Sequence, residues 1–167
     1  MYSAIDIANY TVNYIKECGR HISNLKLQKL LYYIQAAFLC ERGEDCFDEA
    51  ILCWRHGPVI PSVYNRFSQY GSDEIPQQRT ENRLVFKAGR LQMENVSIDT
   101  DRICKRDKEL INSVLDGLMD YSAWYLVDRT HEEEPWRRLK DYNDEITSSS
   151  IRDYFMNHQE RIYGQFN

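Results

Sequence analysis

Apolar residues recur along most of the chain at the three- and four-residue spacing of amphipathic helices. The first such segment carries Ile5, Ala8, Val12 and Ile15, with Ser3 placed to cap its start. Similar stripes follow downstream, where glycine and proline residues interrupt them. Together these patterns predict helices over residues 4–18, 24–42, 61–70, 101–119, 123–130, from 135 onward, and 151–158.

Short polar residues stand before most of these segments, as is typical of helix N-caps. Ser23 or Asn24 precedes the second helix, and Asp101 and Ser122 precede two later ones. The three consecutive serines at residues 148–150 are expected to form a cap cluster for the last helix rather than a linker.

Two regions lack helical spacing and instead indicate strands. Residues 50–54 form a short apolar run, and Gly57-Pro58 is expected to turn the chain after it. Residues 83–87 and 91–98 are separated by Ala88-Gly89, which favours a small hairpin.

The expected fold class is therefore mostly α (α+β). We expect a single compact helical domain over residues 1–167, with about six to seven helices and a small β-hairpin or short sheet. Residues 72–100 are the least regular part of the chain, and they could also form a mobile excursion that orders on a partner.

The helix predicted over residues 24–42 carries a second stripe beside its apolar one. Lys26, Lys29 and Tyr33 recur along this stripe at helical spacing. They predict either a solvated flank of an amphipathic helix or a contact surface for an acidic partner.

Composition narrows the class of protein. Of the 167 residues, 43% are hydrophobic and 28% are charged, which is typical of a globular chain. Apolar runs are too short for a membrane helix, and the N-terminus does not resemble a signal peptide, so a cytoplasmic location without membrane contact is expected.

The net charge of −5 disfavours binding to nucleic acid, whose phosphates are negatively charged. The five scattered cysteines are expected to be free thiols.

Two histidines are the main candidates for chemistry. His56 precedes the Gly-Pro pair, and His131 precedes three glutamates and a Pro-Trp pair. If the fold brings them together, they could form an acid–base or metal site; otherwise each ring bonds to the backbone at the end of an element. Zinc-protease, nucleophile-elbow and phosphate-loop motifs are absent from the sequence, so no catalytic residue, no metal site and no cofactor are predicted.

Aromatic residues are abundant in this chain. They make up 13% of the chain, and 12 of them are tyrosines. Each buried tyrosine hydroxyl or tryptophan N–H needs a partner, and these residue types are favoured at protein interfaces. The enrichment therefore favours either half-buried aromatics at the core boundary or a protein-binding surface.

Three blocks of the sequence resemble the Panacea domain family of SocA-like and phage-associated GepA-like proteins. The blocks are residues 26–33 (KLQKLLYY), residues 54–64 (Trp-x-x-Gly-Pro-Val-x-Pro-x-Val-Tyr) and residues 130–136 (Thr-His-x-x-x-Pro-Trp). The resemblance spans roughly residues 4–157, and it does not extend to residues 72–100.

The resemblance implies a non-enzymatic antitoxin that neutralises a cognate toxin protein by direct binding. One member of the family is a proteolytic adaptor that delivers its toxin to the ClpXP protease, so ClpXP is a second expected partner. Some members carry an added DNA-binding helix-turn-helix, for which this chain shows no corresponding segment.

The motif residues fall into two groups of predictions. The structural group consists of Trp54, Gly57, Pro58, Pro61, Pro135 and Trp136. The group expected to be exposed and to bind a partner consists of Lys26, Lys29, Tyr33, His56, Tyr64 and His131. Two alternatives remain: an enzyme or small-molecule site between the two histidines, and a phage or mobile-element factor that binds another host protein.

Overall fold

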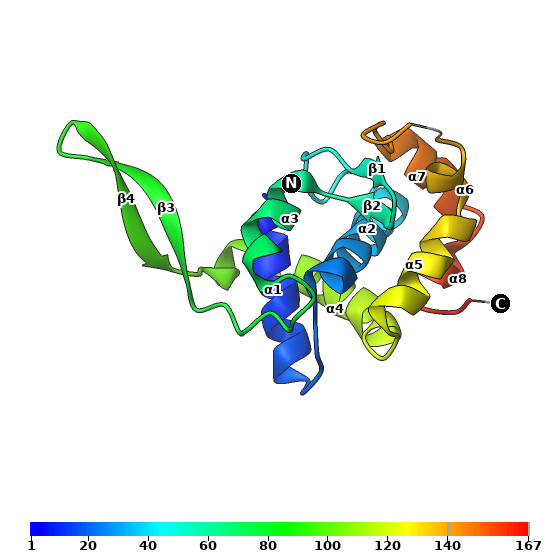
Figure 1. The fold of residues 1–167 in the computed structure, drawn as a ribbon, viewed down its shortest axis with the longest axis horizontal. Helices are drawn as coiled ribbons and strands as arrows, with labels where there is room; N and C mark the ends of the chain where they lie inside the picture. The colour runs from blue at the N-terminus through cyan, green and yellow to red at the C-terminus, as the bar shows by residue number, and fades with distance from the viewer. Residues whose placement is uncertain (140, 167) are drawn as a thin grey trace.

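The computed structural model describes residues 1–139 and 141–166, which form a helical body with a long β-hairpin projecting from it (Figure 1). The helices are α1 (Ala4–Glu17), α2 (Asn24–Glu41), α3 (Pro61–Phe67), α4 (Lys105–Leu118), α5 (Ala123–Glu132), α6 (Glu134–Arg137), α7 (Ser148–Phe155) and α8 (Gln159–Ile162). The strands are β1 (Leu52–Trp54), β2 (Gly57–Val59), β3 (Thr80–Lys87) and β4 (Arg90–Ser97). Single 3₁₀ turns follow α3 and β4. The predicted mostly helical fold class is confirmed.

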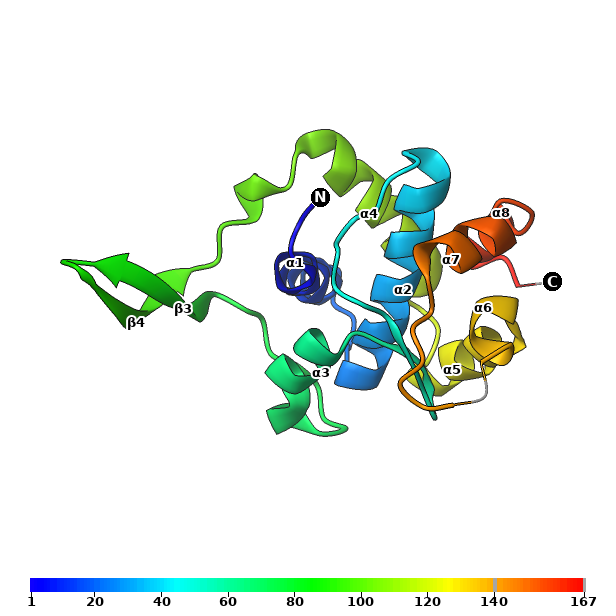
Figure 2. The same ribbon diagram turned by 90° about the horizontal axis from the view of Figure 1, so that it is seen from above.

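Helix α2 is the centre of the body. It contacts α1, α4, α5, α7 and α8 and lies between them in both views (Figures 1 and 2). Because neighbours surround it, nearly every side chain from Asn24 to Leu39 is buried, the polar ones included. The prediction of a solvated flank on this helix is therefore wrong.

Side-chain caps fix the starts of three helices at the predicted residues. The hydroxyls of Ser3, Ser23 and Ser122 accept hydrogen bonds from backbone N–H groups in the first turns of α1, α2 and α5. Two caps were predicted wrongly. Helix α4 begins only after Cys104, and the side chain of Thr147, rather than the following serines, caps α7.

Strands β1 and β2 form a tight antiparallel pair that packs on α2 and α5. Trp54 pairs with Gly57, so the chain turns at Arg55-His56 and not, as predicted, at Gly57-Pro58. The backbone of Cys53 also exchanges hydrogen bonds with Asn143 and Asp144, which ties the loop before α7 to the outer side of β1.

The second sheet is the predicted hairpin, but it is longer than expected. Strands β3 and β4 pair over their full lengths, from Thr80 opposite Ser97 to Lys87 opposite Arg90. The turn residues Ala88 and Gly89 both have positive φ, of 50° and 76°, which is the backbone geometry of a tight two-residue hairpin turn. In both views the hairpin extends away from the helices (Figures 1 and 2).

No helix in the described part of the chain is long and apolar enough to cross a membrane.

Candidate functional site

The structure brings the two tryptophan corners of the sequence together. The indole N–H of Trp136, on α6, donates a hydrogen bond to the backbone carbonyl of Trp54 on β1, with an N–O distance of 3.0 Å. The ring of His131, at the end of α5, stacks on Trp136 with 3.9 Å between the ring centres. The β1–β2 turn is thus fastened to the α5–α6 junction.

Lys29 lies beneath this junction with its side chain fully buried. Its ammonium group donates a hydrogen bond to the backbone carbonyl of Pro58, 2.9 Å away. Burial lowers the pKa of Lys29 from 10.5 to about 7, because the charged form has lost its hydration. The prediction that Lys29 is exposed is therefore wrong, and its visible role is to hold β2 against α2.

Gly57 completes the packing at this point. Its φ of +99° is rarely adopted by residues with a β-carbon. A β-carbon there would also lie 2.7 Å from the hydroxyl of Thr130 and 2.8 Å from the ammonium of Lys29. The glycine is therefore required both by the backbone and by the close approach of two helices.

The two histidines converge, as one hypothesis required, but their surroundings differ. His131 is half-buried, and burial together with the charge of Lys29 lowers its pKa. His56 is exposed at the turn and packs edge-on against Trp124 of α5, with 5.1 Å between the ring centres. Among the described residues, no three His, Cys, Asp or Glu side chains are grouped to hold a metal ion.

Exposed aromatic and cationic side chains surround this turn. Trp124 and Tyr142 are 58% and 63% exposed, and Tyr64 is 37% exposed. Tyr64 packs edge-on against Trp54, with 5.1 Å between the ring centres. An open hollow of about 370 Å³ lies between Trp54, Arg55, Tyr142 and Asn143. We call this region the turn surface, and define it as Trp54, Arg55, His56, Tyr64, Trp124 and Tyr142.

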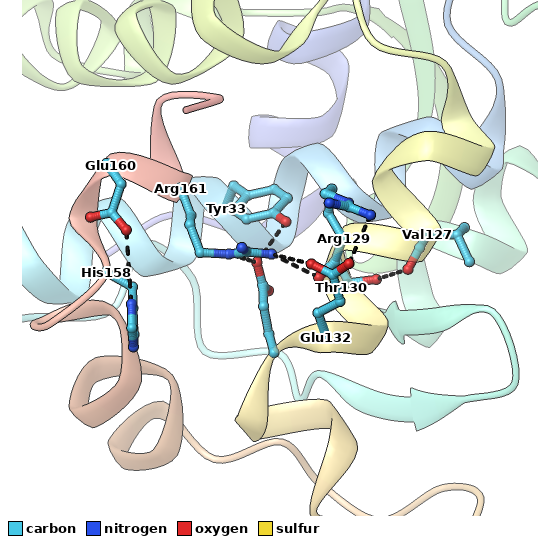
Figure 3. A network of polar contacts seen from close by, with 9 residues as sticks. Tyr33, Val127, Arg129, Thr130, Glu132, His158, Glu160 and Arg161 are labelled. Atoms are coloured by element: carbon cyan, nitrogen blue, oxygen red, sulfur yellow. Dashed lines mark hydrogen bonds and ion pairs between the residues drawn. The ribbon is translucent and has the colours of Figure 1, made fainter. Parts of the chain in front are cut away.

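A buried ion pair lies at the C-terminal end of α5, where Arg161 of α8 reaches it (Figure 3). The guanidinium of Arg161 contacts the carboxylate of Glu133 at 3.0 Å, and the hydroxyl of Tyr33 donates to the same carboxylate oxygen at 2.8 Å. Arg161 also donates to the backbone carbonyl of Arg129 at 3.0 Å. Burial raises the pKa of Glu133 to about 7, although the charge of Arg161 opposes this shift.

The predicted contact residues therefore separate into two sets. His56 and Tyr64 are exposed and His131 is half-buried, all near the β1–β2 turn. The other three are buried: Lys26, Lys29 and Tyr33. The ammonium of Lys26 donates a hydrogen bond to the backbone carbonyl of Met119. The predicted exposure of these three is wrong, because α2 is surrounded by helices.

The residues of the predicted structural group all lie at or next to the junction. Gly57, Pro58 and Pro135 are buried, whereas both tryptophans are half-buried. Pro61 occupies the first turn of α3, as expected from its missing N–H.

Sequence reasoning did not assign a site role to Trp124, Tyr142, Glu133 or Arg161. The aromatic enrichment was the available signal for Trp124, whose position in the first turn of α5 leaves it exposed. The Glu133–Arg161 pair joins residues 28 positions apart, and local spacing gives no signal for such a contact.

Comparison with known proteins gives two matches. The sequence profile of the family described as "Antitoxin SocA-like, Panacea domain" matches residues 27–137. Antitoxin SocA of Caulobacter vibrioides (strain NA1000 / CB15N) is 38% identical over 69 residues, which cover 41% of this chain and 37% of that protein. The alignment thus spans little more than a third of the relative. No solved structure matches the chain.

Proposed function

Because the chain belongs to the Panacea domain family of SocA-like antitoxins, we propose that it neutralises a cognate toxin protein by binding it through the turn surface. The observation that carries this proposal is the gathering of exposed tryptophan, tyrosine and arginine side chains around one fixed turn. These are the residue types that contribute most to binding energy at protein interfaces.

The scaffold behind the turn surface suits such a role. The Lys29–Pro58 hydrogen bond, the Trp136–Trp54 hydrogen bond and the close contact at Gly57 fix the turn from below. A surface that is already ordered loses little conformational entropy when a partner binds, and it therefore retains more of the interaction energy as affinity.

The net charge of −5 adds a long-range component. A toxin with a basic substrate-binding surface would be attracted to this chain, which raises the association rate at low salt. We propose no catalytic step, because the fastened turn and the stacked His131 ring are accounted for by a binding role.

Co-expression with a small toxic reading frame adjacent to the gene tests the proposal. The unchanged chain should restore growth, and the double variant Trp124→Ala/Tyr142→Ala should not. Met156→Ala, directly after α7, removes a side chain that is 49% exposed outside the turn surface, and it is the matched control that should still restore growth. Growth restored by the folded double variant would contradict the proposed surface.

A second variant separates binding from catalysis. His131→Phe keeps an aromatic ring for the stack on Trp136 but removes the imidazole. Binding alone predicts that this variant still restores growth, whereas acid–base chemistry at His131 predicts failure by a folded protein.

The toxin level in the same cells distinguishes two modes of neutralisation. If the chain masks the toxin, the toxin accumulates in complex with it. If the chain delivers the toxin to ClpXP, the toxin level falls, and deletion of the protease restores it.

A further inference from the structure

The projecting β3–β4 hairpin has one face that is uncovered and apolar at its far end. In the strand register, Leu84 lies opposite Met93 and Phe86 lies opposite Leu91, so all four side chains point to one side of the hairpin. They are 61%, 63%, 71% and 63% exposed in that order. Soluble monomers rarely leave such a cluster uncovered without a binding role for it.

This face carries no charge along its whole length. Nearer the body, the same side continues with the facing pairs Asn82–Asn95 and Thr80–Ser97. The charged side chains lie on the opposite side, where Arg83 contacts Asp6 of α1 at 2.9 Å and Lys87 contacts Glu94 at 2.7 Å. We call the uncharged side the hairpin face.

Within residues 1–139 and 141–166, the hairpin is attached to the body at its base. The carboxylate of Glu81 is buried and accepts a hydrogen bond from Asn9 of α1 at 3.2 Å. Beyond Arg83, the two strands have their principal contacts with each other. A two-stranded hairpin with a bare apolar face is only marginally stable in water, so this half gains most from a partner.

We propose that the hairpin face is the dimer interface between two copies of this chain. A two-fold axis brings the same patch against itself, and an uncharged patch meets no like charge when it does so. The whole chain carries a net charge of −5, so two copies repel one another, which makes a charge-free face the favourable place for contact.

The available area is sufficient for this interface. Side chains of this size carry roughly 150–250 Å² each, so the four exposed residues leave on the order of 500 Å² of apolar area per copy. Two faces packed as layers about 10 Å apart bury about 1,000 Å², the size at which specific interfaces begin.

The hairpin lies at one end of the molecule, away from β1, β2 and α5 in both views (Figures 1 and 2). A dimer formed there therefore leaves both turn surfaces free. The inference does not depend on the proposed toxin binding.

Sedimentation equilibrium of the full-length chain tests the proposal. The unchanged chain should show a concentration-dependent monomer–dimer equilibrium below about 100 µM. Phe86→Glu/Leu91→Glu should weaken the dimer by at least about ten-fold. Val85→Glu/Gln92→Glu places the same two charges on the facing pair of the opposite side and should leave the dimer unchanged.

A charge exchange excludes loss of folding as the explanation. Phe86→Lys/Leu91→Lys should also be monomeric, but an equimolar mixture with the glutamate variant should restore a dimer containing one chain of each kind. The inference would be overturned if the unchanged chain remained monomeric at about 100 µM. It would also be overturned if neither the glutamate nor the lysine variant of Phe86 and Leu91 weakened the dimer. If the unchanged chain is a monomer and Phe86→Glu/Leu91→Glu loses toxin neutralisation, the hairpin face binds the toxin instead. That result would also overturn the dimer inference.

Discussion

Gly57 shows how one residue can hold together the region behind the turn surface. Three elements meet there: β2 through its own backbone, α2 through Lys29 and α5 through Thr130. The approach is so close that a single additional carbon atom would displace one of them. The glycine therefore determines the distance between the turn surface and the helices that support it.

Replacement of Gly57 by alanine should lower the free energy of unfolding by about 2–3 kcal/mol, because the new methyl group adds steric overlap to backbone strain. Gly19→Ala is the matched control: its φ is +69°, but nothing lies within 4 Å of the added carbon. Its cost should be about 1 kcal/mol. Urea denaturation measures both, and equal losses would contradict the steric argument.

Lys29 should make stability depend on pH. The unfolded chain keeps this proton up to pH 10.5, whereas the folded protein releases it near pH 7. Between these values the unfolded state binds more protons, so Lys29 makes the free energy of unfolding rise with pH, by up to about 1.4 kcal/mol per unit.

The free energy of unfolding of Lys29→Met should therefore exceed that of the unchanged protein by the largest amount below pH 7. This difference should shrink toward pH 9. Urea denaturation across this range measures the difference, with the exposed Lys105→Met as control. A difference between Lys29→Met and the unchanged protein that does not vary with pH would contradict the burial of a titrating lysine.

At the residue scale, the sequence could identify the motif residues but not their exposure. Helical spacing correctly placed Lys26, Lys29 and Tyr33 on one stripe of α2. Whether a stripe meets solvent depends on which other elements pack around the helix, and α2 is contacted by α4, α5, α7 and α8 from distant parts of the chain as well as by its sequence neighbours α1 and α3. Periodicity within one segment carries no information about that packing.

At the element scale, prediction succeeded where the determinants are local. The caps at Ser3, Ser23 and Ser122 and the Ala88-Gly89 turn act within a few residues, and they appear where expected. The cap of α7 lies one residue before the predicted serines, at Thr147. Pairing between distant segments was missed, because the attachment of Cys53 to Asp144 and of Arg161 to Glu133 depends on the assembled fold.

Arg161 ties helix α8 to the end of α5 through such a distant contact. Arg161→Met leaves the Glu133 carboxylate buried beside Tyr33 without its counter-ion. We expect a loss of about 3 kcal/mol at pH 8, because an unpaired buried charge is costly. The loss should decrease toward pH 5, where protonation of Glu133 removes that charge.

Thermal or urea unfolding at the two pH values measures this effect. Arg152→Met is the control, since Arg152 is an exposed arginine on the neighbouring helix α7. A loss that is the same at pH 5 and pH 8 would indicate that Arg161 contributes by packing rather than by compensating the carboxylate.

At the scale of the whole molecule, the two candidate interaction surfaces lie apart. The turn surface is formed on the helical body, and the hairpin face projects from its opposite end (Figure 1). A dimer would thus present two turn surfaces, so two toxin molecules could be bound by one antitoxin assembly.

Family membership and the general fold class were accessible from sequence because the three motif blocks define the junction of the body. The composition of the turn surface was only partly accessible. Trp124 and Tyr142 join it from segments outside those blocks, and only the folded chain brings them beside His56 and Trp54.

The most direct test is the affinity of the purified chain for the toxin that we propose it neutralises, measured by titration calorimetry. Trp124→Ala/Tyr142→Ala should weaken binding at least about thirty-fold, because the two exposed aromatic anchors are together worth at least about 2 kcal/mol. Met156→Ala should bind like the unchanged chain. Unchanged affinity in the folded double variant would contradict recognition through the turn surface.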